Sequence, residues 1–443
     1  MLFFVYFPIY NIVLMRYLKI CFKASVFLAV CLILSPHLSP RVYAQDLYGN
    51  IADYLNNIYG TDENAGLTAF PVLNIPMGGR AEGLAGAFSA ISDDISFLEF
   101  NPAGSSMLER TELGFFHNNW IGDTNIEAAA FTTRFGNWGF AGGLKWLYMP
   151  FTEYNLYGER ASSGYYSEGV FTLNSSYTFF SSYSFSGVSL GVNLKTAFRM
   201  MPDFSDNYDN IIAGSGSDQS TFAIMMDIGL LTRFNWFKFY TSLEKNMSAA
   251  FVIRNFGAAA KDEALPTALS FAVSYKPIRP LQFSLDFVMP VNLLDPSLSE
   301  KPYLSFGFSA NITNFLSMRT GIMFKAGSSR FTIGSELNLN KMTLDINYTL
   351  DLLTQFQPLN RISLAVRFDL GDNGRQLRKD RVEDLYLIGL EAYSREEFSD
   401  ARFCWEEALR LDPQFEPARE GLIVLEKRQD LLQRIEEMYI FNF

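Results

Sequence analysis

The chain contains many segments of about ten residues in which apolar and polar side chains alternate along the sequence. In residues 188–199, one set of alternate positions holds Val188, Leu190, Val192, Leu194, Thr196 and Phe198, and the other holds Ser189, Gly191, Asn193, Lys195, Ala197 and Arg199. Successive side chains of a β-strand point to opposite faces, so one face of this strand suits hydrocarbon and the other suits water or a filled lumen. This contrast is typical of a strand in a transmembrane β-barrel.

The same alternation recurs through the middle of the chain. We expect 14 strands, over residues 111–118, 126–135, 138–149, 165–180, 184–199, 219–234, 236–256, 266–276, 281–289, 303–312, 315–325, 330–339, 342–352 and 361–370. An even number of antiparallel strands is what a single-chain outer-membrane barrel requires. Aromatic girdles are expected near the strand ends, where the sequence places Trp138, Trp146, Tyr148, Trp236 and Tyr240. A soluble β-sandwich is the alternative, but it would have to bury this alternation over every strand.

Composition excludes several other classes of protein. Downstream of the N-terminus no run approaches the ~20 apolar residues that a membrane-spanning helix needs. A hydrophobic content of 49% and an aromatic content of 16% exclude a disordered chain. A net charge of -11 argues against nucleic-acid binding, because that binding relies on Lys and Arg to neutralise phosphates.

Residues 1–44 have the order of regions expected of a secretory signal peptide. They contain no Asp or Glu, and Arg16, Lys19 and Lys23 precede an apolar run over residues 24–34. Small Ala44 marks the expected cleavage site. Translation from Met15 and a retained N-terminal helix are the alternatives. After cleavage Cys404 is the one remaining cysteine, so we expect no intramolecular disulfide and no thiolate metal site.

The composition changes sharply at residues 371–374. Charged residues rise from 52 of the 330 residues at 45–374 to 27 of the 69 residues that follow. The first region is typical of strands and turns, and the second of solvated helices. We therefore expect a plug and N-terminal periplasmic segment over 45–110, a barrel over 111–370, a linker over 371–379 and a helical domain over 380–443.

Residues 76–104 precede the strands and are rich in glycine and other small residues, without strand alternation. At membrane depth, irregular backbone is stable only where its polar groups are satisfied inside protein. A barrel of this strand number is wide enough to hold such a segment. The sequence therefore predicts a plug, or hatch, inside the lumen. Asp93 and Asp94 are expected to cap a local turn or to pair with lumen cations such as Arg134, Lys195 or Arg199.

This segment resembles the hatch of the outer-membrane long-chain fatty-acid transporter family, which is FadL-like, and of its PorV-like relatives in secretion-associated barrels. The residues that carry the resemblance are Gly79, Arg80, Ala81, the small residues up to Ala90, Asp93, Asp94, Asn101, Pro102 and Ala103. The resemblance implies a 14-stranded barrel occluded by a hatch that includes the Asn-Pro-Ala turn. It implies an outer-membrane location and passive uptake of a hydrophobic ligand, with long-chain fatty acids as the expected cargo. No ligand-binding residue carries over, because no motif surrounds the lumen cations here.

A second resemblance supports a different function. Residues 253–257, together with residues 265–267, resemble a strand-loop-strand signature of the secretion-associated relatives. That resemblance implies a barrel that transports nothing and serves as a membrane platform for secretion or assembly. Both functions are kept as hypotheses.

The C-terminal region has the small and large residue spacing of a tetratricopeptide (TPR) repeat. The matching positions are Leu385, Ile388, Gly389, Ala392, Phe398, Ala401, Trp405, Ala408, Leu409 and Pro413. A third helix is expected over residues 417–438, and a generic helical hairpin is the alternative. Because one repeat cannot bury its apolar face alone, we expect it to dock a periplasmic protein, or else to cap the barrel. An even strand number places both termini in the periplasm.

The sequence gives no indication of an enzyme. The mature chain has one histidine, His117, and no nucleophile motif accompanies it. One histidine and one cysteine also make a zinc site improbable. We therefore expect no catalytic residue, no metal and no cofactor.

Overall fold

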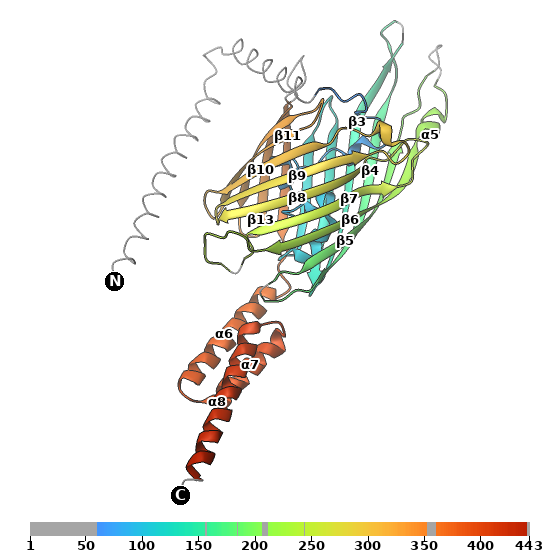
Figure 1. The fold of residues 1–443 in the computed structure, drawn as a ribbon. Coiled ribbons are helices and arrows are strands. Elements are labelled where there is room, and N and C mark those ends of the chain that lie inside the picture. The colour runs from blue at the N-terminus through green and yellow to red at the C-terminus, as the bar shows by residue number, and fades with distance from the viewer. Residues whose placement is uncertain are drawn as a thin grey trace, which may run out of the picture. The chain divides into compact units, whose positions relative to one another are not determined.

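The computed structural model describes residues 60–155, 157–183, 185–205, 211–242, 244–351 and 360–440. The expected signal peptide and the first residues of the expected plug region lie outside these ranges. Within them, 14 antiparallel strands form a closed barrel (Figure 1). Each strand pairs with its neighbours in the chain, and β1 closes the barrel against β14. This confirms the predicted fold class.

The strand bounds follow the predicted segments closely. The strands are β1 (Glu112–Asn119), β2 (Asn125–Phe135), β3 (Trp138–Tyr154), β4 (Arg160–Phe179), β5 (Val188–Met200), β6 (Thr221–Phe234), β7 (Met247–Gly257), β8 (Thr267–Ile278), β9 (Leu281–Val291), β10 (Tyr303–Asn311), β11 (Leu316–Phe324), β12 (Arg330–Asn338), β13 (Met342–Asp351) and β14 (Asn360–Asp369). The short helices α5 (Ser215–Gln219) and η3 (Pro296–Leu298) lie in two of the connections.

The burial pattern is the reverse of that in a soluble protein. On β5 the polar side chains of Ser189, Asn193 and Lys195 are buried, whereas Leu190 and Leu194 are exposed. The same pattern recurs on β9, where Asp286 is buried between the exposed Leu285 and Phe287. Hydrocarbon-facing side chains thus cover the outside, and polar side chains face a filled interior, as the alternation predicted.

One predicted strand began too early. Residues 236–246 form a connection instead of the start of β7. The Trp236 backbone N–H donates to Asn246 Oδ1 (2.8 Å), and Asn246 Nδ2 donates to the Trp236 carbonyl (2.6 Å). These two bonds close the loop at its base. The alternating aromatic and polar residues within the loop therefore do not pair with a neighbouring strand.

The two ends of the barrel differ in their connections. One end, the loop rim, carries the described connections at residues 120–124, 157–159, 201–205, 211–220, 258–266, 292–302 and 325–329. The other end, the turn rim, carries those at residues 136–137, 180–187, 235–246, 279–280, 312–315 and 339–341. Thr111, which precedes β1, bonds Gly371, which follows β14 (2.7 Å), so the chain enters and leaves the sheet at the turn rim.

The segment before β1 runs through the lumen from the loop rim to the turn rim (Figure 1). It contains η1 (Pro71–Leu73), α3 (Arg80–Gly83), α4 (Phe97–Phe100) and η2 (Pro102–Met107). At its start, Asn64 Nδ2 donates to the carbonyls of Ser297 (3.1 Å) and Ser299 (3.0 Å) in the loop rim. Its last turn contacts β3, β4 and β5 close to the turn rim. This plug fills the interior, which explains why inward-facing side chains are buried.

The helices α6 (Arg375–Ser394), α7 (Phe398–Leu411) and α8 (Glu416–Ile440) follow the barrel in the chain. They enclose a core around Trp405, against which Gly389 and Gly421 pack so closely that a Cβ on either would lie within about 3 Å of the indole ring. The expected use of small residues between the helices is therefore present, while the tetratricopeptide assignment stays a prediction. Among the described residues, no helix has the length and apolar character needed to cross a membrane.

Candidate functional site: the plug and the lumen cavity

The Asn-Pro-Ala turn is fixed firmly to the wall near the turn rim. Asn101 is fully buried, and its Nδ2 donates to the carbonyls of Ser89 (2.9 Å) and Leu230 (3.2 Å). Its Oδ1 accepts the Ala103 N–H (3.0 Å) and so caps η2. The Pro102 carbonyl accepts a hydrogen bond from Asn174 of β4 (2.9 Å). We call residues 101–107 the anchor turn.

Glycines in the wall make room for the anchor turn. A Cβ on Gly191 of β5 would lie 2.2 Å from the Pro102 backbone, and one on Gly229 of β6 would lie 2.1 Å from Asn101 Oδ1. These distances are too short for any side chain. The anchor turn is also held by hydroxyl groups, since Ser106 Oγ lies 2.8 Å from Ser189 Oγ. The plug backbone therefore rests directly on the sheet at this point.

Asp93 and Asp94 do not pair with the cations predicted for them. Arg80 Nη1 bonds Asp93 (2.7 Å), and Arg367 Nη1 lies 3.0 Å from Asp94. Asp94 also accepts the Ser96 N–H (2.8 Å), which confirms the alternative of a capped local turn. The three candidate cations are engaged elsewhere: Lys195 pairs with Asp227 (2.6 Å), Arg199 with Glu168 (3.2 Å), and Arg134 donates to the Gly136 carbonyl (2.7 Å).

Burial acts to raise the pKa of Asp93, but the attraction of the Arg80 guanidinium, with Lys276 and Arg233, outweighs it and lowers that pKa. Asp93 is therefore an ionised partner for Arg80. Glu82 behaves in the opposite way. It is buried and accepts hydrogen bonds from Asn118 (2.9 Å) and Thr349 (3.0 Å). Burial raises the pKa of Glu82 by more than Arg361 and Arg330 lower it.

A network of charges on β11–β14 holds Asp94 and was not predicted. Arg367 contacts Glu336 (2.8 Å) and Asp345 (3.0 Å), and Arg319 bonds Asp345 (2.7 Å) and Glu336. These four side chains occupy polar positions of the alternating pattern on adjacent strands. The alternating pattern therefore predicts that all four charged side chains face the lumen. It does not predict which of them pair, because pairing depends on the register between strands.

A cavity of about 140 Å³ lies between the plug and the wall. Its apolar lining includes Leu73, Ile75, Met77, Leu98, Phe100, Val170, Val288 and Met323. Its cationic lining consists of Lys145, Lys195, Arg254, Lys325 and Arg330. The cavity therefore combines a hydrocarbon surface with positive charge.

Three of the lining cations are neutralised by carboxylates and two are not. Lys145 pairs with Glu99 (2.5 Å), Lys195 with Asp227 (2.6 Å) and Lys325 with Glu300 (2.6 Å). Within the described ranges no carboxylate lies at ion-pair distance from Arg254 or Arg330. Arg254 Nη2 donates to Ser270 Oγ (3.2 Å), its buried Nε has no partner, and its guanidinium lies 5.9 Å from the centre of the Phe100 ring.

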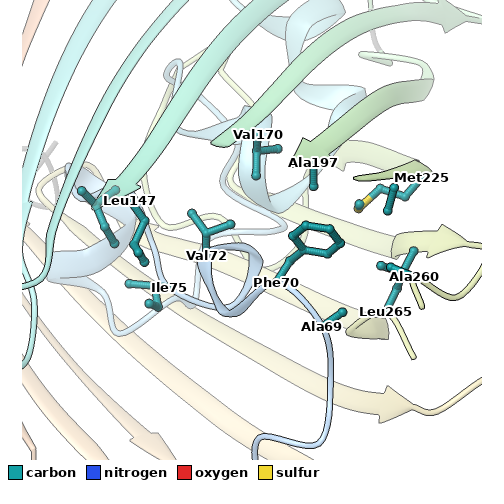
Figure 2. Close-up of a cluster of buried hydrophobic side chains, with 12 residues drawn as sticks. Ala69, Phe70, Val72, Ile75, Leu147, Val170, Ala197, Met225, Ala260 and Leu265 are labelled. Carbon is teal, nitrogen blue, oxygen red and sulfur yellow. The ribbon is translucent and has the colours of Figure 1, made fainter. Parts of the chain in front are cut away.

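Beside the cavity, the first part of the plug packs on apolar side chains. Figure 2 shows Phe70, Val72 and Ile75 of the plug against Leu147 and Val170 of the wall. The cluster also contains Ala69, Ile126, Ala197, Ala223, Met225, Ala260 and Leu265. We call residues 60–77 the strap. Phe70 is fully buried with a left-handed backbone (φ 56°), a conformation that costs a non-glycine residue about 1–3 kcal/mol.

The remaining predicted candidates have structural roles. Residues 253–257 and 265–267 meet at a bulge in β7, where Asn255 (φ 54°) accepts from Thr267 Oγ1 (2.9 Å) at its carbonyl and donates from Nδ2 to Pro266 (3.1 Å). His117 pairs with Glu127 (2.8 Å), and both side chains are more than two-fifths exposed. In the part of the chain that the structure describes, no three His, Cys, Asp or Glu residues gather to hold a metal ion.

The chain belongs to the UPF0164 family, because residues 51–373 match the family described as "Uncharacterised protein family (UPF0164)". A UPF0164 protein of Treponema pallidum (strain Nichols) is 29% identical over 398 residues, covering 86% of this chain and 88% of that protein. A second from the same organism is 25% identical over 390 residues, covering 84% and 77%. Among solved structures, the toluene transporter TbuX of Ralstonia pickettii aligns with a TM-score of 0.41 and 12% identity, covering 69% of this chain and 99% of that one. The toluene transporter TodX of Pseudomonas putida gives 0.40 and 12%, covering 61% and 92%.

Proposed function

We propose that this UPF0164 protein is an outer-membrane transporter for the passive uptake of hydrophobic molecules, with long-chain fatty acids as its cargo. The observation that carries the proposal is the lumen cavity. Its apolar lining suits an alkyl chain, and the guanidinium groups of Arg254 and Arg330 suit a carboxylate. A purely polar solute would gain nothing from the apolar lining, and a neutral hydrocarbon would form no ion pair with either guanidinium group.

Transport requires the plug to rearrange. The cavity of about 140 Å³ is smaller than the roughly 300–1,000 Å³ of common ligand sites, so a long chain fits only if part of the plug moves. The strap is the part best suited to move. Its apolar contacts can be replaced by those of an alkyl chain, and the strained backbone at Phe70 is relieved when it leaves. The anchor turn, with its directional bonds to β4 and β6, stays in place.

Uptake of labelled fatty acid by vesicles that contain the full-length protein tests the proposal. We expect uptake faster than in protein-free vesicles, and a loss in Arg254→Gln on the order of tenfold, the scale of a charge-assisted hydrogen bond of about 1.5–3 kcal/mol. Arg160→Gln, which removes an exposed arginine near the loop rim, serves as the matched control and should transport normally. Uptake equal to that of protein-free vesicles contradicts the proposal.

The orientation in the membrane follows from the connections. Outer-membrane barrels have short periplasmic turns and longer outer loops, so the turn rim is expected to face the periplasm, and the chain leaves β14 at that rim. The helices α6–α8 would then be periplasmic. The positions around Trp405 are buried in their own core, so a partner protein would contact exposed apolar side chains such as Ile388 (48% exposed) and Phe403 (64% exposed). This arrangement is also what a secretion or assembly platform would need. Co-purification of a secreted protein without any fatty-acid uptake would favour that alternative.

A further inference from the structure

The turn rim carries a patch that is both aromatic and basic. It is formed by the β6–β7 connection at residues 235–246 and the β8–β9 turn at residues 279–280. Trp236, Phe237 and Phe239 are 53%, 66% and 72% exposed. Lys238, Lys245 and Arg279 lie among them, with Glu244 as the one acidic residue in the two connections. We call this set the rim patch.

The rim patch is held together by hydrogen bonds between the two connections. Tyr275 Oη donates to the Phe237 carbonyl (2.7 Å), and Arg279 Nη2 donates to the Thr241 carbonyl (2.8 Å). The Asn246 side chain closes the base of the longer connection through its two bonds to Trp236. Cations from separate parts of the sequence are therefore fixed side by side.

The contacts of Lys238 and Arg279 orient these two cations without cancelling their charge. Lys238 Nζ donates to the carbonyls of Ser242 (2.5 Å) and Glu244, and it lies 4.9 Å from the centre of the Tyr240 ring. Among the described residues no carboxylate forms an ion pair with Lys238 or Arg279. Burial and, next, the charge of Lys238 lower the pKa of Lys245. An anion would relieve this concentration of positive charge.

Positive charge is a local property of this rim. The whole chain has a net charge of -11, and the described part of the β5–β6 connection at the loop rim contains Asp203 and Asp218 and no Lys or Arg. The rim patch also contacts the wall, because the ring centres of Trp236 and Tyr275 of β8 lie 6.4 Å apart. Exposed aromatic rings at a barrel edge lie at the level of lipid headgroups.

We propose that the rim patch binds the phosphate of an anionic phospholipid headgroup through Lys238 and Arg279, with Trp236 and Phe239 against the first part of the acyl chains. Charge complementarity identifies the anion, and the exposed aromatic rings identify a lipid as its source. A soluble anion would meet the cations but would leave the rings in water.

Mass spectrometry of the intact full-length protein, released from micelles with equal amounts of phosphatidylglycerol and phosphatidylcholine, tests this site. We expect bound phosphatidylglycerol to exceed phosphatidylcholine, and the preference to fall about fivefold for each cation removed in the double variant Lys238→Ser/Arg279→Ser. The control Arg160→Ser/Lys261→Ser removes one arginine and one lysine near the loop rim and should keep the preference. Lys238→Gln alone, which disturbs the connection less, should show about a fivefold loss.

Three outcomes would overturn the proposal. Equal retention of the two lipids by the unaltered protein shows that no headgroup charge is recognised. An equal loss in the rim-patch and control variants assigns the preference to total charge. Release of phosphatidylglycerol by an equal concentration of inorganic phosphate assigns the cations to a free anion in place of a lipid.

Discussion

The two halves of the lumen hold the plug in different ways. In the half near the loop rim, Phe70, Val72 and Ile75 contact apolar side chains of β2–β6. Hydrogen bonds also hold the strap there, such as those from the Ala69 N–H to the Ala264 carbonyl (2.8 Å) and from the Val72 N–H to Glu168 (3.0 Å). In the half near the turn rim, Asn101 and Ser106 bond the wall directly, and glycines bring the plug backbone onto the sheet. The apolar contacts and the polar contacts differ in how easily a hydrophobic cargo could replace them.

The two halves of the lumen have different roles in this account of transport. Apolar contacts are non-directional, so an alkyl chain can substitute for the apolar side chains of the strap. Hydrogen bonds of a buried amide such as Asn101 have no substitute in a hydrophobic cargo, and breaking them leaves buried polar groups without partners. The half near the loop rim is therefore the moving part, and the half near the turn rim is the fixed part.

Deletion of residues 78–104 should have the largest effect. The strands keep their own hydrogen bonds, so the barrel should still close, while the lumen opens to water. We expect conductance in planar bilayers to rise by on the order of tenfold or more, because an empty barrel of this size is a wide channel. Unchanged conductance in a correctly folded barrel would show that the segment does not occlude the pore.

Phe70→Ala should weaken the strap specifically. Removing a fully buried phenylalanine costs about 3–5 kcal/mol, and here that cost falls on the closed position of the strap. We expect fatty-acid uptake to rise while conductance to small ions stays low, because the anchor turn remains. Phe315→Ala, at a 57% exposed position in the β10–β11 turn, is the control and should change neither quantity.

Gly191→Ala should disturb the fixed half. The new Cβ would lie 2.2 Å from the Pro102 backbone, and overpacking of this kind costs about 1–3 kcal/mol. We expect ion leakage to increase and the urea midpoint of unfolding to fall. In Gly142→Ala the new Cβ meets nothing closer than 3.7 Å, so that variant should behave like the unaltered protein. Equal behaviour of the two variants would remove the distinction between the halves.

Glu82→Gln should give the smallest effect, which depends on pH. The pKa of Glu82 is raised above its ordinary value of 4.5, mainly by burial, so its contribution to stability is complete below that value and is lost as the pH rises through the raised pKa. Glutamine has no proton to lose. We expect the free energy of unfolding, measured with urea, to fall from pH 4 to pH 8 by more in the unaltered protein than in the variant. The difference between the two should be on the order of 1 kcal/mol. If the free energies of unfolding of the two proteins changed in parallel with pH, the burial of Glu82 would not raise its pKa.

The sequence predicted the barrel well because strand alternation is a local property. Each segment such as residues 281–289 shows which side chains face outward without any knowledge of its neighbours. The error at residues 236–246 has a physical cause, because the two hydrogen bonds between Trp236 and Asn246 close this segment into a loop. Local alternation of residue types does not reveal a contact between residues ten positions apart.

The site was predicted only in part. The hatch residues from Gly79 to Ala103 were selected as one group, whereas the structure divides their partners between the β11–β14 network and the anchor turn. The partners of Asp93 and Asp94 were wrong because contacts between a plug and a wall depend on how the chain turns inside the lumen. Arg254 was noted only as part of a family signature, although an arginine in a strand of a barrel lumen was itself a signal of a charged lining.

Two engineered disulfides test the central claim, that the strap moves while the anchor turn stays. Thr68 and Ala264 are bridge partners at the loop rim, and the Oγ atoms of Ser106 and Ser189 lie 2.8 Å apart near the turn rim, so each pair suits a disulfide after replacement by cysteine, with Cys404→Ser to avoid mispairing. Fatty-acid uptake would be measured for both proteins, oxidised and then reduced. The account predicts that oxidation of the Thr68→Cys/Ala264→Cys pair stops uptake and reduction restores it, while oxidation of the Ser106→Cys/Ser189→Cys pair changes nothing. Normal uptake with the first disulfide closed, or loss of uptake with the second, would contradict it.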